Sequence, residues 1–254
     1  MIDIHCHILS GIDDGAKTME DSVALAKAAV KEGIHTIIAT PHHMNGRYEN
    51  TRAIILEKTA LLNERLKEES IPLTILPGQE PAIHGEILEG LENEEIQTLN
   101  DTQYLFIELP SGYVPRYTEK LLFDIQLKGL IPIIVHPERN QEMVEKPDLL
   151  YQFIKKGALS QVTASSVNGK FGKKVKSFSE QLIEANLVHF IASDAHNLTS
   201  RSFHLENAYD HIHNRYGVDM TYLFKENAEL LLEGSNVLRE VPQHVKKKKF
   251  LGLF

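Results

Sequence analysis

The sequence predicts an α/β protein in which parallel strands alternate with helices and close into a seven-stranded barrel. Two observations support this fold class. Short runs rich in Ile, Val and Leu alternate with longer amphipathic stretches, which is the order of right-handed strand–helix–strand units. Polar residues of metal-ligand type also follow almost every strand at its carboxyl end. A barrel gathers those ends at one rim, whereas the outer strands of an open sheet end far apart. We therefore expect a barrel with its active site at the carboxyl-terminal rim.

The strands are predicted where short apolar, β-branched runs occur. In chain order they are Ile2–His7, His35–Thr40, Leu73–Pro77, Gln103–Leu109, Ile131–Val135, Ser160–Ala164 and Val188–Ala192. Side chains alternate along a strand, so Asp3, His5 and His7 should share one face of the first strand. The opposite face should carry its apolar residues, which are Ile2, Ile4, Cys6 and Ile8.

The helices are predicted where apolar residues recur with a helical period between those strands. They are Ser22–Lys31, Thr51–Glu68, Pro115–Lys128, Asp148–Lys156, Lys173–Ala185, Ser200–Tyr216 and Thr221–Leu232. Gly33, Gly129 and Gly157 follow three of them, where a left-handed residue that ends a helix is usually glycine. His35 and His189 lie in predicted strands, and we expect both to have packing roles.

The composition fits one large domain, which we place at residues 1–241. A chain of 254 residues, 42% of them hydrophobic, can bury a substantial core. The one compositional break is the segment 242–254, PQHVKKKKFLGLF. We expect a solvated end there, and the alternative is a weak contact of residues 246–254 with an anionic membrane or an acidic partner.

Bulk properties also exclude several classes of protein. The net charge of −8 argues against a general nucleic-acid binder. No signal peptide or transmembrane run is visible, so a cytoplasmic protein is expected. A single cysteine, Cys6, cannot form an internal disulfide. A cysteine-based phosphatase would need Cys-x5-Arg, but the residue six positions after Cys6 is Ile12.

The chemistry is predicted by acidic and histidine side chains at the strand ends. The candidates are His5, His7, Asp14, His42, Glu80, Glu108, His136, Asp194 and His196. Glu108 is the most informative, because a carboxylate in an apolar strand is costly to bury unless it is paired or bound to metal. Imidazole mixed with carboxylate suits manganese, iron or zinc. The set exceeds the ligands of one ion, and Glu80 could give one oxygen to each of two metals.

Two arginines each lie a few residues after one of the predicted ligands. Arg139 lies three residues after His136, and Arg201 lies five residues after His196. A guanidinium group matches phosphate oxygens, so we predict phosphate binding by Arg139. For Arg201, phosphate binding and a surface salt bridge are both open. Asp13 could exchange roles with Asp14.

The same segments resemble the polymerase-and-histidinol-phosphatase (PHP) superfamily, which has a distorted seven-stranded barrel and a trinuclear metal site. The matching segments are IDIHCHIL, DDGA, ATPHH, PGQE, FIELP, VHPERN and ASDAHN, in family order. Within the superfamily, the chain is most similar to the manganese-dependent protein-tyrosine phosphatases of capsule and exopolysaccharide gene clusters, and especially to their Bacillus-type branch.

This resemblance implies three Mn²⁺ ions. His5, His7, Glu80 and Asp194 would hold the first ion. Glu80, Glu108 and His136 would hold the second. Asp14, His42 and His196 would hold the third, and Arg139 and Arg201 would bind phosphate.

The implied activity is hydrolysis of phosphotyrosine in proteins, by direct attack of a metal-bridging hydroxide. The tyrosyl oxygen would leave as a metal-stabilised phenolate or be protonated by a nearby acid. The implied partners are a cytoplasmic tyrosine autokinase and its substrates. Three alternatives are a phosphatase of small molecules such as histidinol phosphate, a phosphodiesterase or exonuclease, and a non-catalytic metal-binding regulator.

Overall fold

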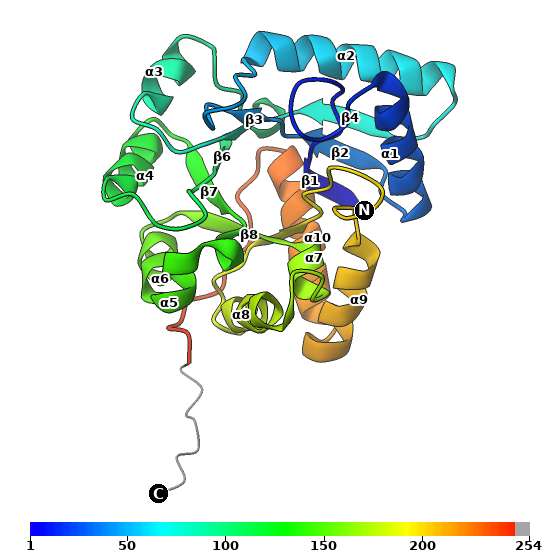
Figure 1. Ribbon diagram of the computed structural model, residues 1–254. Helices are drawn as coiled ribbons and strands as arrows, with labels where there is room; N and C mark the ends of the chain where they lie inside the picture. Colours follow the sequence, from blue (N-terminus) through cyan, green and yellow to red (C-terminus); the bar gives the residue numbers. More distant parts are fainter. Residues whose placement is uncertain (247–254) are drawn as a thin grey trace, which may run out of the picture.

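The computed structural model describes residues 1–246 and confirms the alternation of parallel strands and helices (Figure 1). All seven predicted strands are present. They are β1 (Ile2–Cys6), β2 (Thr36–Ala39), β4 (Thr74–Pro77), β6 (Tyr104–Ile107), β7 (Ile131–Val135), β8 (Leu159–Thr163) and β9 (Phe190–Ala192). Two further strands of two residues each, β3 (His42–His43) and β5 (Glu80–Pro81), lie where the sequence suggested loops.

The strands form three parallel sheets, so a closed seven-stranded barrel is not confirmed. Their orders are β1-β2-β4, β3-β5 and β6-β7-β8-β9. Isolated parallel bridges from Cys6 to Ala195 and from Ala82 to Glu108 connect the sheets near the carboxyl ends of their strands. Pro41 separates β2 from β3, and Gly78 separates β4 from β5. A side chain at Gly78 would begin 2.5 Å from an Ile38 methyl carbon, so only glycine fits this break.

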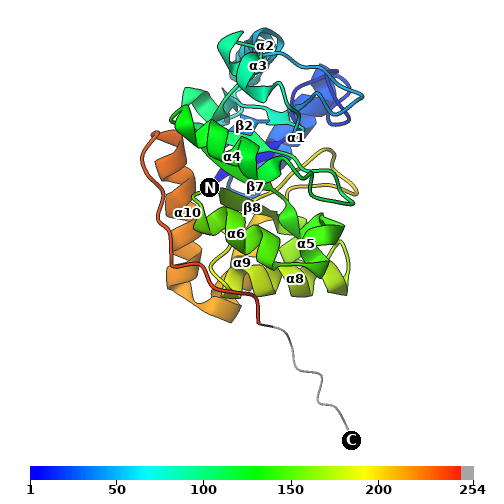
Figure 2. The same ribbon diagram turned by 90° about the vertical axis from the view of Figure 1, so that its left-hand side faces the viewer.

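The seven predicted helices are also present and cover the sheets. They are α1 (Met19–Lys31), α2 (Arg52–Glu68), α4 (Thr118–Leu127), α6 (Asp148–Lys155), α8 (Lys173–Glu184), α9 (Leu205–Tyr216) and α10 (Val218–Leu232). Shorter elements that the sequence did not predict are α3 (Ile87–Glu92), η1 (Leu99–Asp101), η2 (Pro137–Arg139), α5 (Gln141–Glu145) and α7 (Ala164–Val167). Figure 2 shows α4 and α6 over β7 and β8.

Helix α9 begins five residues later than predicted because a turn occupies the expected first turn of the helix. The Asn197 side-chain oxygen accepts hydrogen bonds from the backbone N–H groups of Thr199 and Ser200, at 2.9 Å each. The carboxylate of Glu32 accepts from the N–H groups of His204 and Leu205 and so caps the helix from outside. The turn leaves Arg201 free of the helix.

A register shift in β1 overturns the expected division of its faces. The pairing with β2 shifts between Asp3 and Cys6, which is the signature of a β-bulge. Ile2 and Ile4 pack in a core cluster with residues of β6 to β9 and of α10, whereas Cys6 and Ile8 pack in a second cluster that includes α1 and α2. The predicted common apolar face is therefore wrong. Cys6 is nevertheless a fully buried core residue, as expected.

The described end of the chain contacts the domain, although Gln243, His244 and Lys246 are exposed to solvent. The Gln243 N–H donates to the Ala185 carbonyl oxygen at 2.8 Å. His244 Nδ1 lies 2.7 Å from Asp148 Oδ1, and the centre of the His244 ring lies 3.8 Å from the centre of the Tyr151 ring. Residues 247–254 lie outside the described part, and so does most of the segment predicted to touch membrane. None of the helices within residues 1–246 has the length and apolar character of a membrane span.

The two strand histidines differ in their environments. His35 is exposed, so the expected packing role is wrong for it. His189 is buried, and its Nδ1 accepts a hydrogen bond from the Ser160 N–H at 3.2 Å. This burial lowers the pKa of His189 to about 3 from its ordinary 6.5.

We predict that His189 makes the fold acid-sensitive. His189 binds a proton near pH 6.5 in the unfolded chain but only near pH 3 in the folded protein. The free energy of unfolding therefore falls as the pH falls through that range. His189→Asn keeps an acceptor for Ser160 without this titration. Between about pH 7.5 and about pH 5, wild type should lose about 2 kcal/mol more than the variant in urea unfolding. The exposed His213→Asn should lose as much as wild type, and equal losses in all three proteins would contradict the prediction.

Candidate metal centre

The structure brings all nine predicted ligand residues to one place at the carboxyl ends of the strands. Each contributes a side-chain atom within about 4 Å of another member, and they come from the ends of β1, β3, β5, β6, β7 and β9 and from the loop before α1. The bulge in β1 reverses the alternation of side chains after Asp3. His5 and His7 therefore point toward this cluster, on the side of the strand to which Ile2 and Ile4 point. Both imidazoles are fully buried.

Glu80 is the centre of the cluster. Its Oε1 lies 3.4 Å from His5 Nε2 and 2.9 Å from His136 Nε2. Its Oε2 lies 3.3 Å from His7 Nε2 and 2.9 Å from His42 Nδ1. The side chain is completely buried. Burial alone would raise the pKa of Glu80, but the surrounding imidazoles hold it well below its usual range.

Asp194 joins the imidazoles to the two arginines. Its Oδ1 lies 3.4 Å from His7 Nε2 and 3.5 Å from His5 Nε2. Its Oδ2 lies 2.9 Å from a terminal nitrogen of Arg139 and 3.0 Å from one of Arg201. The residue has a left-handed backbone (φ 54°) and donates its N–H to the His5 carbonyl oxygen at 2.8 Å. Such strain in a non-glycine residue persists only where surrounding contacts hold it.

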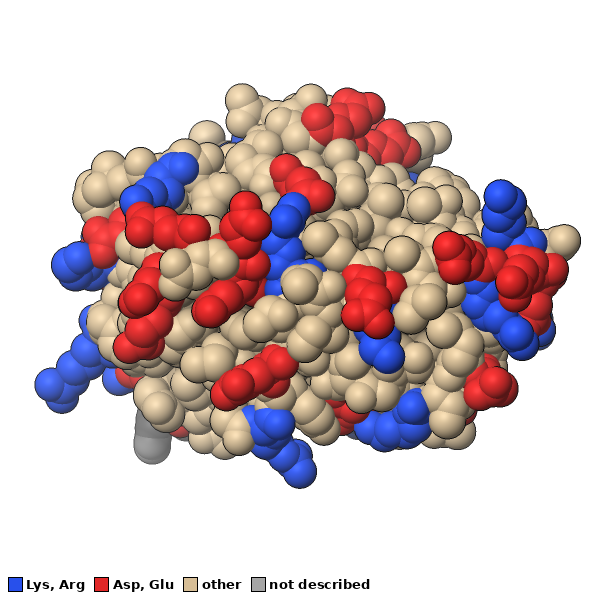
Figure 3. Space-filling model, turned by 90° about the horizontal axis from the view of Figure 1, so that it is seen from above, with Lys and Arg blue, Asp and Glu red and all other residues tan. Residues whose placement is uncertain are grey.

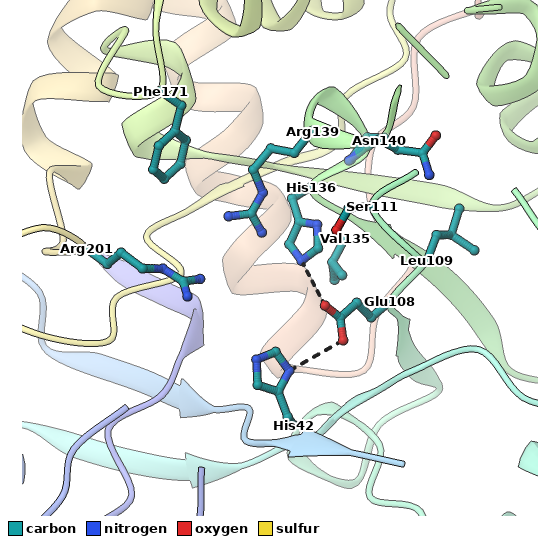
Figure 4. Close-up of a pocket in the computed structure, with 11 residues that line it drawn as sticks. His42, Glu108, Leu109, Ser111, Val135, His136, Arg139, Asn140, Phe171 and Arg201 are labelled. Carbon is teal, nitrogen blue, oxygen red and sulfur yellow. Dashed lines mark ion pairs between the residues drawn. The ribbon is translucent and has the colours of Figure 1, made fainter. Parts of the chain in front are cut away.

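Asp14 and Glu108 lie at the solvent side. Asp14 Oδ1 is 3.4 Å from Nε2 of both His42 and His196. Glu108 lies between His42, at 3.4 Å, and His136, at 4.0 Å, as Figure 4 shows. Asp14 is 43% exposed and Glu108 21%. The cluster is therefore closed on the sheet side and open at the rim.

The side chains group in three overlapping sets whose ligand atoms lie within 4.8 Å of one another. The sets are His5, His7 and Glu80; His42, Glu80 and Glu108; and His7, Asp14, His42 and His196. They overlap with the three sets implied by the family resemblance without matching them fully. His42 takes the place of His136 in the second set, and Asp194 belongs to none of the three. The assignment of ligands to individual ions stays a prediction.

The chemistry of this donor set fits divalent cations. Within residues 1–246, the buried atoms Glu80 Oε2, His42 Nδ1 and His196 Nε2 have charged or polar neighbours at 2.9 to 3.4 Å, but none of these contacts has the geometry of a hydrogen bond. Five carboxylates (Asp13, Asp14, Glu80, Glu108 and Asp194) face two guanidinium groups here, which leaves an excess of three negative charges before any imidazole is protonated. Burial opposes it, yet the Glu80 charge raises the pKa of His42 to about 10. A site that draws protons onto imidazole in this way also attracts metal ions.

Two residues that sequence reasoning did not assign as ligands orient the histidines. His7 Nδ1 donates to Asp13 Oδ2 at 2.7 Å, and Asp13 Oδ1 accepts from the Gly15 N–H at 2.8 Å. His5 Nδ1 donates to Gln161 Oε1 at 2.9 Å. Both bonds leave Nε2 free to face the cluster. Asp13 therefore lies behind His7 and has not exchanged roles with Asp14. The only feature of the sequence that could have pointed to the role of Gln161 is a polar glutamine inside a predicted strand.

Position 15 must be glycine because the chain passes very close to the backbone of His7 there. A Cβ at this position would lie 2.0 Å from the His7 carbonyl oxygen, and no side chain fits such an approach. The tripeptide Asp13-Asp14-Gly15 thus supplies a histidine partner, a rim carboxylate and a close backbone contact, one from each residue.

The fold and the site together define a parallel α/β protein with an acidic, histidine-rich centre suited to several divalent cations at its strand ends. Residues 1–233 match the family described as "Capsular polysaccharide synthesis, CpsB/CapC", and the chain belongs to that family.

Relatives with known names agree with this membership. The chain is 52% identical to tyrosine-protein phosphatase YwqE of Bacillus subtilis over the full length of both proteins. It is 34% identical to tyrosine-protein phosphatase CpsB of Streptococcus pneumoniae over 91% of this chain and 98% of the relative. A crystal structure from work on YwqE and CpsB, described as unique metal-dependent tyrosine phosphatases, superposes with a TM-score of 0.95 at 53% identity. The superposition covers 97% of this chain and all of that one.

We predict that Asp13→Asn weakens metal binding. The substitution removes the charge that stabilises the donating His7 Nδ1, and changes to such supporting residues typically cost about 10- to 100-fold in metal affinity. Calorimetric titration of the metal-free protein with Mn²⁺ would measure the loss. Asp124→Asn, which alters a surface pair with Lys120, is the matched control and should bind Mn²⁺ like wild type. Unchanged affinity in Asp13→Asn would contradict the assigned role of Asp13.

Proposed function

We propose that this chain is a metal-dependent protein-tyrosine phosphatase that acts in regulation of capsule or exopolysaccharide synthesis. The observation that carries the proposal is the convergence of Arg139 and Arg201 on Asp194, beside the cluster of imidazoles and carboxylates. A cavity of about 340 Å³ opens on this point, and both arginines, Glu108 and His136 line it (Figure 4). The names of the CpsB/CapC relatives support the same activity.

The arginines are positioned to bind the phosphate. Their guanidinium groups reach the cavity from η2 and from the turn before α9, and Asp194 fixes both. Burial alone would lower the pKa of Arg139, but the Asp194 charge raises it, so this cation persists at any working pH. Planar guanidinium groups can donate paired hydrogen bonds to phosphoryl oxygens and stabilise charge that grows as the ester bond breaks.

The cluster supplies the remaining chemistry. His5, His7, Glu80 and Asp194 would hold one cation, and Glu108, His136, Asp14, His42 and His196 would complete the ligands of two more. When bound, these cations, which we propose are Mn²⁺, activate water and neutralise phosphoryl oxygens. We infer direct transfer of the phosphoryl group to water. The only cysteine, Cys6, is fully buried with its sulfur 3.5 Å from the Ala195 carbonyl oxygen and cannot act as a nucleophile.

The rim position of the site suits a protein substrate. Glu108 and Asp14 are partly exposed, so a phosphotyrosine side chain on a flexible segment can approach them without entering a deep pocket. We therefore propose as substrate the phosphorylated tail of a cytoplasmic tyrosine autokinase, together with its targets. The surface seen in Figure 3 carries interspersed acidic and basic side chains, which does not suggest a nucleic-acid partner.

A phosphate-release assay tests the function. We expect rapid release from a phosphotyrosine peptide in Mn²⁺, with at least about tenfold lower kcat/KM on a phosphoserine peptide and on histidinol phosphate. Adding a chelator should abolish release. Activity that survives chelation would contradict the metal dependence, and a preference for histidinol phosphate would overturn the substrate assignment.

We also predict that Arg139→Ala lowers kcat/KM on the phosphotyrosine peptide by about 100- to 1,000-fold, the usual loss when one donor to the transition-state charge is removed. Arg116→Ala removes an exposed arginine outside the cavity and should retain wild-type activity. Circular dichroism would verify that both variants are folded. A folded Arg139→Ala protein with near wild-type turnover would show that the phosphate site is elsewhere.

A further inference from the structure

Phe171 is an aromatic residue that the catalytic chemistry does not use, yet it lines the cavity. It lies in the connection between α7 and α8, within Asn168-Gly169-Lys170-Phe171-Gly172. The ring is partly exposed. In Figure 4, Phe171 is on the same side of the cavity as Arg201 and Arg139, and Leu109 is on the opposite side.

The connection that carries Phe171 is held by several hydrogen bonds. Asn168 donates from its side chain to the His204 carbonyl oxygen at 2.9 Å, and the Lys170 N–H donates to the Ser165 carbonyl oxygen at 2.9 Å. Gly169 and Gly172 have φ angles of +79° and +94°, which other residues rarely adopt. These hydrogen bonds hold the connection to neighbouring elements, and the two glycines allow the chain to turn on either side of Lys170 and Phe171.

Phe171 also contacts the phosphate-binding group. The Arg139 Cζ lies 5.6 Å from the centre of the Phe171 ring, within the range of a cation–π interaction. A nitrogen of the same guanidinium is 2.9 Å from Asp194. An aromatic surface therefore stands directly beside the place where the arginines would receive a phosphoryl group. In phosphotyrosine a single oxygen separates phosphorus from the aromatic ring, so that ring must lie close to the arginines as well.

We propose that Phe171 is a specificity-determining residue that packs against the phenyl ring of phosphotyrosine and so favours aryl over alkyl phosphate esters. This inference rests on the proposed function. Aromatic pairs pack in offset or edge-to-face arrangements that add to simple burial of apolar area. The apolar side chains of Leu109 and Val135 also line the cavity, although both are largely buried.

A different role for Phe171 is to hold Arg139 in place. The two roles predict different losses. A residue that only positions Arg139 would affect every phosphate ligand equally, because all of them bind the guanidinium group. A residue that recognises the ring would affect only ligands that carry one.

Competitive inhibition separates the two roles without depending on leaving-group chemistry. The probes are benzylphosphonate, ethylphosphonate and inorganic phosphate, tested with the manganese-loaded enzyme on a phosphotyrosine peptide. Phe171→Ala should weaken inhibition by benzylphosphonate about tenfold and leave the other two within about twofold of wild type. Phe171→Tyr should restore benzylphosphonate binding. Leu127→Ala, which removes an exposed apolar side chain on α4, is the control and should change none of the three constants.

Each outcome decides the proposal. Equal weakening of all three probes by Phe171→Ala would assign Phe171 to the support of Arg139 and overturn ring recognition. No change in any constant would overturn it too. Failure of the wild-type enzyme to release phosphate from the phosphotyrosine peptide is a separate result, and it would contradict the proposed function itself.

Discussion

The structure depends on the burial of two carboxylates, Glu80 and Asp194, among imidazoles at the ends of parallel strands. A buried carboxylate is costly unless charge and hydrogen bonds compensate it. Here each oxygen has a neighbour: both oxygens of Glu80 face histidines, Oδ1 of Asp194 faces histidines and Arg201, and Oδ2 faces both arginines. The remaining negative charge calls for cations, so the buried carboxylates, the proposed metal site and the proposed phosphate site meet at one point.

The backbone irregularities of the fold serve this cluster. The bulge in β1 redirects His5 and His7, and the breaks at Pro41 and Gly78 create the short strands β3 and β5, which present His42 and Glu80 in register. Isolated bridges at Cys6 and Ala82 hold the separate sheets together near the site. A regular barrel would keep longer ladders between strands but would aim fewer of these side chains at a common centre. Departures from regular pairing near a functional site are a common use of bulges.

Most of the fold and site could be predicted because periodic apolar runs and strand-end ligands are local signals. All seven long strands, all seven long helices and the spatial convergence of nine ligand candidates followed from them. The sequence could not reveal the β1 bulge, because alternation of Ile2, Ile4 and Cys6 reads the same with or without a shift in pairing. It also could not place Asp13 behind His7 or Gln161 behind His5, since those contacts depend on how the strands meet. The late start of α9 follows from a side-chain turn at Asn197, which competes with helix formation locally.

The divided carboxylate of Asp194 has a consequence for how the protein responds to its ligands. Oδ1 faces the histidines that would bind a cation, Oδ2 holds Arg139, and Arg201 donates to both oxygens at 3.0 Å each. A cation bound near the histidines would reduce the negative charge that Asp194 presents to the arginines, and phosphate bound by the arginines would change the charge that Asp194 presents to the cation. Binding at the two proposed sites would thus be thermodynamically linked: the factor by which a bound cation changes phosphate affinity would equal the factor by which bound phosphate changes cation affinity. The side chain of Asp194, in its left-handed turn, would thereby make the two proposed binding equilibria interdependent.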